Sequence, residues 1–304
     1  MTALDATTPR TTPGPAADKV AGVRRPPRRP ARRRRRPGWL VYALLIAFLI
    51  GSAFPLYWQA IVGSHDTTAV FDSTPPLLPG GNFFSNAARV FDEVEFWKAL
   101  LNSLIVASVI TVSVVLFSTL AGFAFAKLRF RGRDVLYLFV IATMAVPTQL
   151  GIIPLFILMA KYGWTGTLPA VIVPSMVTAL GVFWMRQYLV QALPTELIEA
   201  ARADGCNMIR VFWHVVLPVS RPAAAVLAVF TFVMAWNDFL WPLIVLGPQN
   251  PTVQVAIDQL QSSFDTDFAL VMTGTTLGTL PLLVVFVIFG RQIVAGIMQG
   301  AVKG

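Results

Sequence analysis

The sequence predicts an all-α membrane protein with six transmembrane helices. Hydrophobic residues make up 56% of the 304 residues and charged residues only 13%, whereas soluble domains carry about 25% charged residues. Five long intervals contain no charged side chain, and a sixth contains only Asp238. The one cysteine and two histidines exclude an internal disulfide and a structural zinc site built by this chain alone.

The first segment, residues 1–38, is rich in arginine and proline and includes the run Arg32–Arg36. It has too little apolar surface to offset the entropy of ordering, so we expect a disordered cytoplasmic tail. Nucleic-acid binding and a twin-arginine export signal are the alternatives, but a basic flank before a membrane span is more common. The uncharged stretch 37–64 is too long for the apolar core of a cleaved signal peptide.

The remaining residues, 39–304, are expected to form one transmembrane domain. Its spans are predicted at about 39–62, 100–126, 135–160, 168–186, 222–246 and 270–291. At a rise of 1.5 Å per residue, each is long enough to cross about 30 Å of hydrocarbon. The runs lack the alternation of barrel strands, so helices are the remaining way to satisfy the backbone in lipid. Prolines that are expected to bend these helices are Pro55, Pro147, Pro154, Pro174, Pro242 and Pro281.

The distribution of lysine and arginine predicts the orientation of the spans. The two termini and the loops 127–134 and 186–221 hold 21 of these residues, and the intervening segments hold only 3. Because basic residues concentrate on the cytoplasmic side, both termini are expected in the cytoplasm.

Between the fourth and fifth spans, the sequence has a helical pattern of its own. Pro194 and Thr195 are expected to supply a stop and an N-cap. Glu196 and Glu199 favour the first turn electrostatically, and Gly205 is predicted as the C′ residue with positive φ. A second amphipathic stretch, reaching Leu217-Pro218, places on one face Met208, Val211, Phe212 and Val215. Two short helices joined at Gly205, within residues 194–218, would form a narrow projection, the knob, that can enter a groove on another protein.

This knob resembles the cytoplasmic EAA loop of binding-protein-dependent ABC importer permeases. The resemblance rests on Glu199-Ala200-Ala201, Asp204-Gly205 and Leu217-Pro218, with the family spacing from the glycine to the Leu-Pro pair. Cys206 stands where that family usually has alanine. An amphipathic connector without a partner is the alternative.

Further stretches are similar to the carbohydrate, maltose-type branch of that family, so that the resemblance covers roughly residues 40–304. These stretches are Phe96–Ser103, Ala121–Lys127, Trp236–Pro242 and Gly300–Gly304. The resemblance implies a bacterial plasma-membrane subunit that imports a sugar, such as a di- or oligosaccharide. The solute remains open among maltose, trehalose, cellobiose, polyols and glycerol phosphates.

The resemblance also implies the partners. These are a second homologous permease subunit, two ATP-binding cassette ATPases, an extracytoplasmic sugar-binding protein and membrane lipid, with no nucleic acid. The chain has no G-x-x-x-x-G-K-[ST] phosphate loop. We therefore expect a transport subunit that is not an enzyme and binds no cofactor, with ATP used by its partners. The expected ATPase-coupling residues are Glu199, Ala200, Ala201, Asp204, Gly205, Leu217 and Pro218.

The fifth span offers candidates for the substrate path. Asp238 is the only acidic residue inside any predicted span, and an intramembrane carboxylate is a candidate functional group. Asn237 would join it in accepting sugar hydroxyls, with Trp236 or Trp241 stacking on a sugar ring. Hydrogen bonding between helices is the alternative for all four. The external segment 64–98 either docks the binding protein or only connects two spans.

Other function classes are less compatible with the sequence. An ion-coupled carrier usually places several ionisable groups along its bundle, whereas this chain has one. An intramembrane enzyme would need a nucleophile and base or a set of metal ligands, and His65 and His214 stand apart from any such cluster. A scaffold would not need the glycine-broken knob.

Overall fold

The computed structural model describes residues 38–70, 76–261 and 266–301, and the side chains of these residues other than 69–70 and 291–301. Within these ranges every regular element is a helix. The chain forms two compact units, residues 1–49 and 50–304. The described part of the first unit is the start of α1 (Trp39–Gly63), in which residues 39–49 are all exposed.

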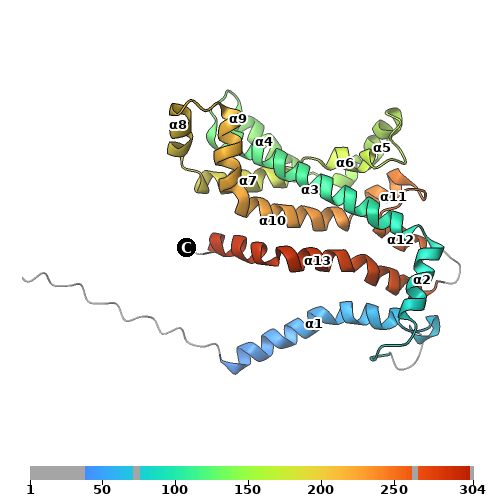
Figure 1. The fold of residues 1–304 in the computed structure, drawn as a ribbon. Coiled ribbons are helices and arrows are strands. Elements are labelled where there is room, and N and C mark those ends of the chain that lie inside the picture. The colour runs from blue at the N-terminus through green and yellow to red at the C-terminus, as the bar shows by residue number, and fades with distance from the viewer. Residues whose placement is uncertain (1–37, 71–75, 262–265, 302–304) are drawn as a thin grey trace, which may run out of the picture. The chain divides into compact units, whose positions relative to one another are not determined.

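The second unit contains the rest of α1 and all other helices (Figure 1). The long elements are α3 (Phe96–Lys127), α7 (Ala179–Ala192), α10 (Leu217–Trp236) and α13 (Phe268–Ala301). Short elements before α10 are η1 (Thr67–Val70), α2 (Phe83–Glu93), α4 (Arg133–Thr143), η2 (Thr148–Gly151), α5 (Ile152–Lys161), α6 (Pro169–Ile172), η3 (Val173–Ser175), α8 (Thr195–Ala203), α9 (Met208–Val211) and η4 (Phe212–Val216). Those after it are α11 (Leu240–Leu246) and α12 (Val253–Gln259).

Five stretches of the described chain are long and apolar enough to cross a membrane. They are Trp39–Gly63, Phe96–Lys127, Pro169–Ala192, Met208–Trp236 and Phe268–Gly290. A sixth is formed if α4 and the η2–α5 segment count as one span, although the chain bends by 93° between them. The interval expected at 222–246 is also interrupted, because α10 ends at Trp236 and α11 begins at Leu240.

Helix α3 lies at the centre of the packing, against α7 and α10, while α10 also packs against α13 (Figure 1). Two glycines permit the close contact between α3 and α7. A Cβ atom on Gly122 would lie 2.8 Å from the Met185 Cβ, and one on Gly181 would collide with the Ser118 Oγ. Since any larger side chain would push the helices apart, these positions set the distance between α3 and α7.

An ion pair holds the start of α13 to α2. Arg89 lies 2.8 Å from the Asp267 carboxylate, which also accepts a hydrogen bond from the Leu270 N–H. Burial raises the pKa of Asp267, but hydrogen bonds from Thr67, Leu270 and Arg89 and the charge of Arg89 outweigh it. The pKa of Asp267 is therefore lowered, and the carboxylate stays ionised as the partner of Arg89.

Candidate functional site

The knob predicted after the fourth span begins with α8. Leu193 and Pro194 are both extended, as expected for a proline and the residue before it. The helix therefore starts at Thr195, with Pro194 at the N-cap position and no side-chain cap. The prediction of Thr195 as the N-cap was wrong, because the extended backbone that a capping residue needs belongs to Pro194. Glu196 lies in the first turn as predicted.

The end of α8 is a Schellman motif centred on Gly205. Its φ is +83°, which confirms the predicted left-handed C′ residue. The Gly205 N–H donates to the Arg202 carbonyl and the Cys206 N–H to the Ala201 carbonyl, each at 3.0 Å. Nothing lies within 4 Å of where a Gly205 Cβ would be. Backbone conformation, and not space, therefore requires the glycine.

The second helix of the knob starts at an asparagine that the sequence analysis missed. The Asn207 side chain caps α9 by accepting a hydrogen bond from the Arg210 N–H at 2.9 Å. The prediction that this stretch ends at Leu217-Pro218 was wrong, since α9 continues through the π turn η4 into α10. Pro218 comes just after the π turn, inside this continuous segment, where a proline bends the helix.

Helix α8 is fixed to the rest of the protein by one face. Ile198 is 6% exposed and belongs to a buried cluster that consists of Phe123, Leu189, Leu193, Ile198, Val211, Phe212 and Val216. Ala201 and Cys206 are half-buried against that cluster. Glu199, Ala200 and Asp204 are exposed. Ala200 and Ala201, both expected to couple to the ATPase, therefore have different surroundings: Ala201 packs against the cluster, whereas Ala200 is exposed.

A second feature is a pocket of about 400 Å³ that lies where three helical segments are interrupted. Thr148, Gln149 and Gly151 come from η2, between α4 and α5. Pro174 and Ser175 come from η3, before α7, and Asp238 from the gap between α10 and α11. Interrupted helices expose backbone and polar groups inside a membrane protein, which is tolerated where they line a cavity.

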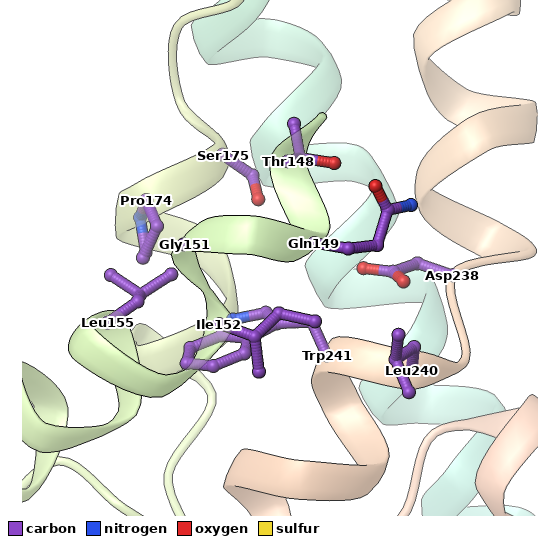
Figure 2. Close-up of a pocket in the computed structure, with 10 residues that line it drawn as sticks. All are labelled: Thr148, Gln149, Gly151, Ile152, Leu155, Pro174, Ser175, Asp238, Leu240 and Trp241. Atoms are coloured by element: carbon purple, nitrogen blue, oxygen red, sulfur yellow. The ribbon is translucent and has the colours of Figure 1, made fainter. Parts of the chain in front are cut away.

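The lining of this pocket combines polar groups with an anchored aromatic ring (Figure 2). The Asp238 carboxylate is directed toward Gln149, and Thr148 and Ser175 add hydroxyl groups. Trp241 is buried and donates from its ring N–H to the Ala170 carbonyl at 3.0 Å, which fixes the ring. The lining contains one carboxylate, one amide, two hydroxyls and no lysine or arginine among the described residues.

Two of the expected substrate-path residues lie elsewhere. Trp236 is 1% exposed, stacks on Phe232 and donates to the Gly278 carbonyl at 3.1 Å. Asn237 is exposed and bonds Val233 and Gln254. Trp236 therefore joins α10 to α13, as in the alternative based on hydrogen bonding between helices. Of the four candidates, Asp238 and Trp241 line the pocket.

The sequence analysis did not identify Thr148, Gln149 or Ser175 as site residues. A signal was present, because these polar residues adjoin Pro147, Gly151 and Pro174 inside otherwise apolar runs, and such interruptions indicate binding sites in transporters. His65 and His214 bond the carbonyls of Leu78 and Arg210. Within the described residues, no three of histidine, cysteine, aspartate and glutamate form a metal-binding group.

Comparisons with known proteins place these features in context. Residues 115–299 match the family "Binding-protein-dependent transport system inner membrane component". The chain is 35% identical to the lactose transport system permease protein LacG of Rhizobium radiobacter, across 89% of this chain and 98% of LacG. It is 31% identical to the arabinooligosaccharides transport system permease protein AraQ of Bacillus subtilis, across 86% of this chain and 90% of AraQ.

A third relative carries a different type of solute in its name. The sn-glycerol-3-phosphate transport system permease protein UgpE of Pectobacterium atrosepticum is 31% identical across 85% of this chain and 95% of UgpE. Among solved structures, a chain of a bacterial ABC transporter involved in the import of the acidic polysaccharide alginate matches with a TM-score of 0.73. That match has 22% identity and covers 83% of this chain and 95% of the other, and it supports the fold alone.

Proposed function

The chain belongs to the family of binding-protein-dependent transport system inner membrane components, and from this premise we propose that it forms part of the path of an imported di- or oligosaccharide. It is a permease subunit of an ABC importer in the plasma membrane. The relatives named for lactose and arabinooligosaccharides support a sugar as the solute.

The lining of the pocket is the observation that carries the choice of solute. Hydroxyl, amide and carboxylate groups exchange hydrogen bonds with sugar hydroxyls, and Trp241 offers an apolar wall. A phosphate ester carries negative charge, which Asp238 would repel and which no lining lysine or arginine would balance. The pocket therefore favours a neutral sugar over sn-glycerol-3-phosphate, the solute in the name of UgpE.

The coupling of the pocket to ATP hydrolysis is proposed to run through α8 and Gly205. In this proposal both termini are cytoplasmic, and α8 sits in a cleft of a partner ATPase. Glu199 and Ala200, which are exposed, contact that ATPase, while Ile198 and Ala201 hold α8 to its own subunit. Asp204 and Gly205 set the direction of the chain after α8, and Leu217 and Pro218 begin the helix that receives the motion.

The proposed complex contains a second homologous permease subunit, two ATP-binding cassette ATPases and an extracytoplasmic sugar-binding protein. ATP is bound by the ATPases, and this chain contributes the membrane path without an active site of its own. Residues 39–304 supply the permease domain, and residues 1–38, nearly all outside the described residues, supply a cytoplasmic tail.

Uptake assays test this proposal directly. A bacterial strain that lacks this chain should lose accumulation of one labelled sugar among maltose, trehalose and cellobiose, and the full-length chain should restore it. Uptake should stop on ATP depletion and persist with an uncoupler, because the energy comes from ATP.

The competing solutes give the contrary outcomes. Restored uptake of sn-glycerol-3-phosphate, with none of the three sugars, would contradict the sugar assignment. Loss of uptake with an uncoupler at constant cellular ATP would instead identify an ion-coupled carrier. Co-purification of the binding protein, followed by identification of its bound ligand, would name the sugar.

A further inference from the structure

The turn between α3 and α4 carries a concentration of positive charge that the transport proposal does not use. Residues 127–134 contain four basic side chains and one acidic side chain. Lys127 donates to the Val190 carbonyl at 3.4 Å, and Arg133 pairs through Nε with Asp134 at 3.0 Å. Arg129 and Arg131 are exposed and have no ion-pair partner within the described residues.

Arg129 and Arg133 line the same cavity. A cavity of about 450 Å³ is lined by Arg129, Phe130, Gly132, Arg133, Asp134 and Val135. The ion pair with Asp134 uses only the Nε of Arg133, so that the terminal nitrogens of both guanidinium groups remain available to an anion. Arg131 lies between the two lining arginines in sequence but does not line the cavity.

The backbone beside this cavity favours the same type of ligand. Gly132 occupies the N-cap position of the 11-residue helix α4 with φ +80°, and no side chain caps the helix. The first N–H groups of α4 are therefore left without a capping side chain, and the positive end of the helix dipole adds to the arginine charge. One turn further along, the Arg186 guanidinium lies 4.2 Å from the centre of the Tyr137 ring, so a further positive charge is held against α4.

The surface next to the cavity indicates where the anion comes from. Val135, Leu136, Leu138 and Phe139, on the first turns of α4, are 72%, 51%, 66% and 66% exposed. A free phosphate ion would make no use of such a surface, whereas the acyl chains of a lipid would cover it. A basic pocket directly above an exposed apolar helix fits a phosphate headgroup with its hydrocarbon chains lying along α4.

We propose that the Arg129–Arg133 cavity binds the headgroup of an anionic phospholipid, such as phosphatidylglycerol, whose acyl chains lie on α4. Arginine suits this role because its planar guanidinium forms two parallel hydrogen bonds to a phosphate. The orientation proposed above would put this lipid in the cytoplasmic leaflet, but binding itself depends only on the local geometry. Basic residues also set membrane topology, so the test must separate binding from total charge.

Native mass spectrometry of the purified full-length chain provides the test. The chain is titrated in detergent with phosphatidylglycerol or with phosphatidylethanolamine, and the dissociation constant of the first bound lipid is measured. Arg129→Gln and Arg131→Gln each remove one charge from the same turn, but only Arg129 lines the cavity. A third variant, with glutamine at Arg32–Arg36, controls for lipid bound by the tail.

The expected result is selective loss of phosphatidylglycerol binding. A basic residue near an anionic surface contributes about fivefold in affinity. Arg129→Gln should therefore weaken the first site by roughly fivefold, and the Arg129→Gln/Arg133→Gln pair by roughly 25-fold. Arg131→Gln and the tail variant should remain within about twofold of the parent chain, and phosphatidylethanolamine should bind weakly to all of them.

Three results would overturn the proposal. Equal weakening by Arg129→Gln and Arg131→Gln would indicate diffuse attraction without a site. Displacement of the lipid by excess inorganic phosphate would identify a phosphate site instead. Unchanged lipid binding in the double variant, with loss of an ATPase partner, would identify a protein contact. If the double variant does not insert into the membrane, the two single variants decide the question.

Discussion

The knob and the pocket are built in opposite ways. The helix ends and turns of the knob are set within residues 193–218, where the Pro194 start, the Gly205 turn and the Asn207 cap follow one another along the chain. The pocket collects its lining from residues 148–155, 174–175 and 238–241, which meet only in the folded protein. The knob is a product of local backbone rules, whereas the pocket is a product of tertiary packing. Substitutions in the knob should therefore impair coupling to ATP hydrolysis, whereas substitutions in the pocket should lower the affinity for the solute.

The largest effect is expected from Gly205→Val. A β-branched residue at φ +83° costs roughly 1–3 kcal/mol of backbone strain, so the turn after α8 should rearrange. We expect sugar uptake to fall by at least about tenfold while the ATPase partners still hydrolyse ATP, measured side by side in proteoliposomes. Gly205→Asn is the matched control, since asparagine tolerates the left-handed region. Normal uptake in Gly205→Val would contradict the assignment of the knob to coupling.

A smaller, affinity-type effect is expected from Asp238→Asn in the pocket. A hydrogen bond to a charged group contributes about 1 kcal/mol more than the neutral bond that asparagine can still make. The half-saturating sugar concentration in the uptake assay should therefore rise by roughly fivefold. The neighbouring Asn237→Ala provides the control, because Asn237 is not among the residues that line the pocket and bonds Val233 and Gln254. Equal losses in the two variants would indicate a structural role for this gap in the helix.

The two tryptophans allow a test of packing against binding. Trp236→Phe removes the donor to the buried Gly278 carbonyl, so thermal unfolding should show a loss of about 1–3 kcal/mol with unchanged sugar affinity. Trp241→Phe removes the bond to the Ala170 carbonyl at the pocket wall, so it should also weaken sugar binding. If Trp236→Phe changed the sugar affinity and Trp241→Phe did not, the roles assigned to the two tryptophans would be reversed.

The turn at Gly205 could be predicted from the sequence, whereas the lining of the pocket could not. The Gly205 turn was predictable because the hydrogen bonds from Gly205 and Cys206 reach back only three and five residues. Thr195 was misassigned because its neighbour Pro194 takes up the extended position. Trp236 is the last residue of α10 and packs against α13, whereas Asp238 lies in the gap after α10. The two were therefore not equivalent candidates, and the sequence alone did not show where α10 ends. Gln149 and Ser175 could not be joined to Asp238 from sequence, since their proximity depends on how three interrupted helices pack.

The smallest effect is expected at Arg89→Gln, which lies in neither the knob nor the pocket. Because the Asp267 pKa is lowered in the folded protein, its stabilising contribution is present above the unfolded value of about 3.9. It is lost as the pH falls through the folded pKa. Arg89→Gln should therefore reduce the free energy of unfolding by less than about 1 kcal/mol at neutral pH, with the difference from the parent chain shrinking below about pH 4. A difference that grows on acidification would contradict this ion-pair account.

The continuity of α9, η4 and α10 has a mechanical consequence. Residues 208–236 form one continuous helical segment of 29 residues, which bends between α9 and α10 (Figure 1). Asn207 lies at one end of it, and the gap that holds Asp238 lies just beyond the other. In the proposed coupling, a movement of α8 has to pass through this bend to reach the gap that holds Asp238. The π turn at Phe212–Val216, Pro218 and Pro222 all lie in this part of the segment, where such features bend helices. Their combined stiffness would therefore set how much of that movement is transmitted.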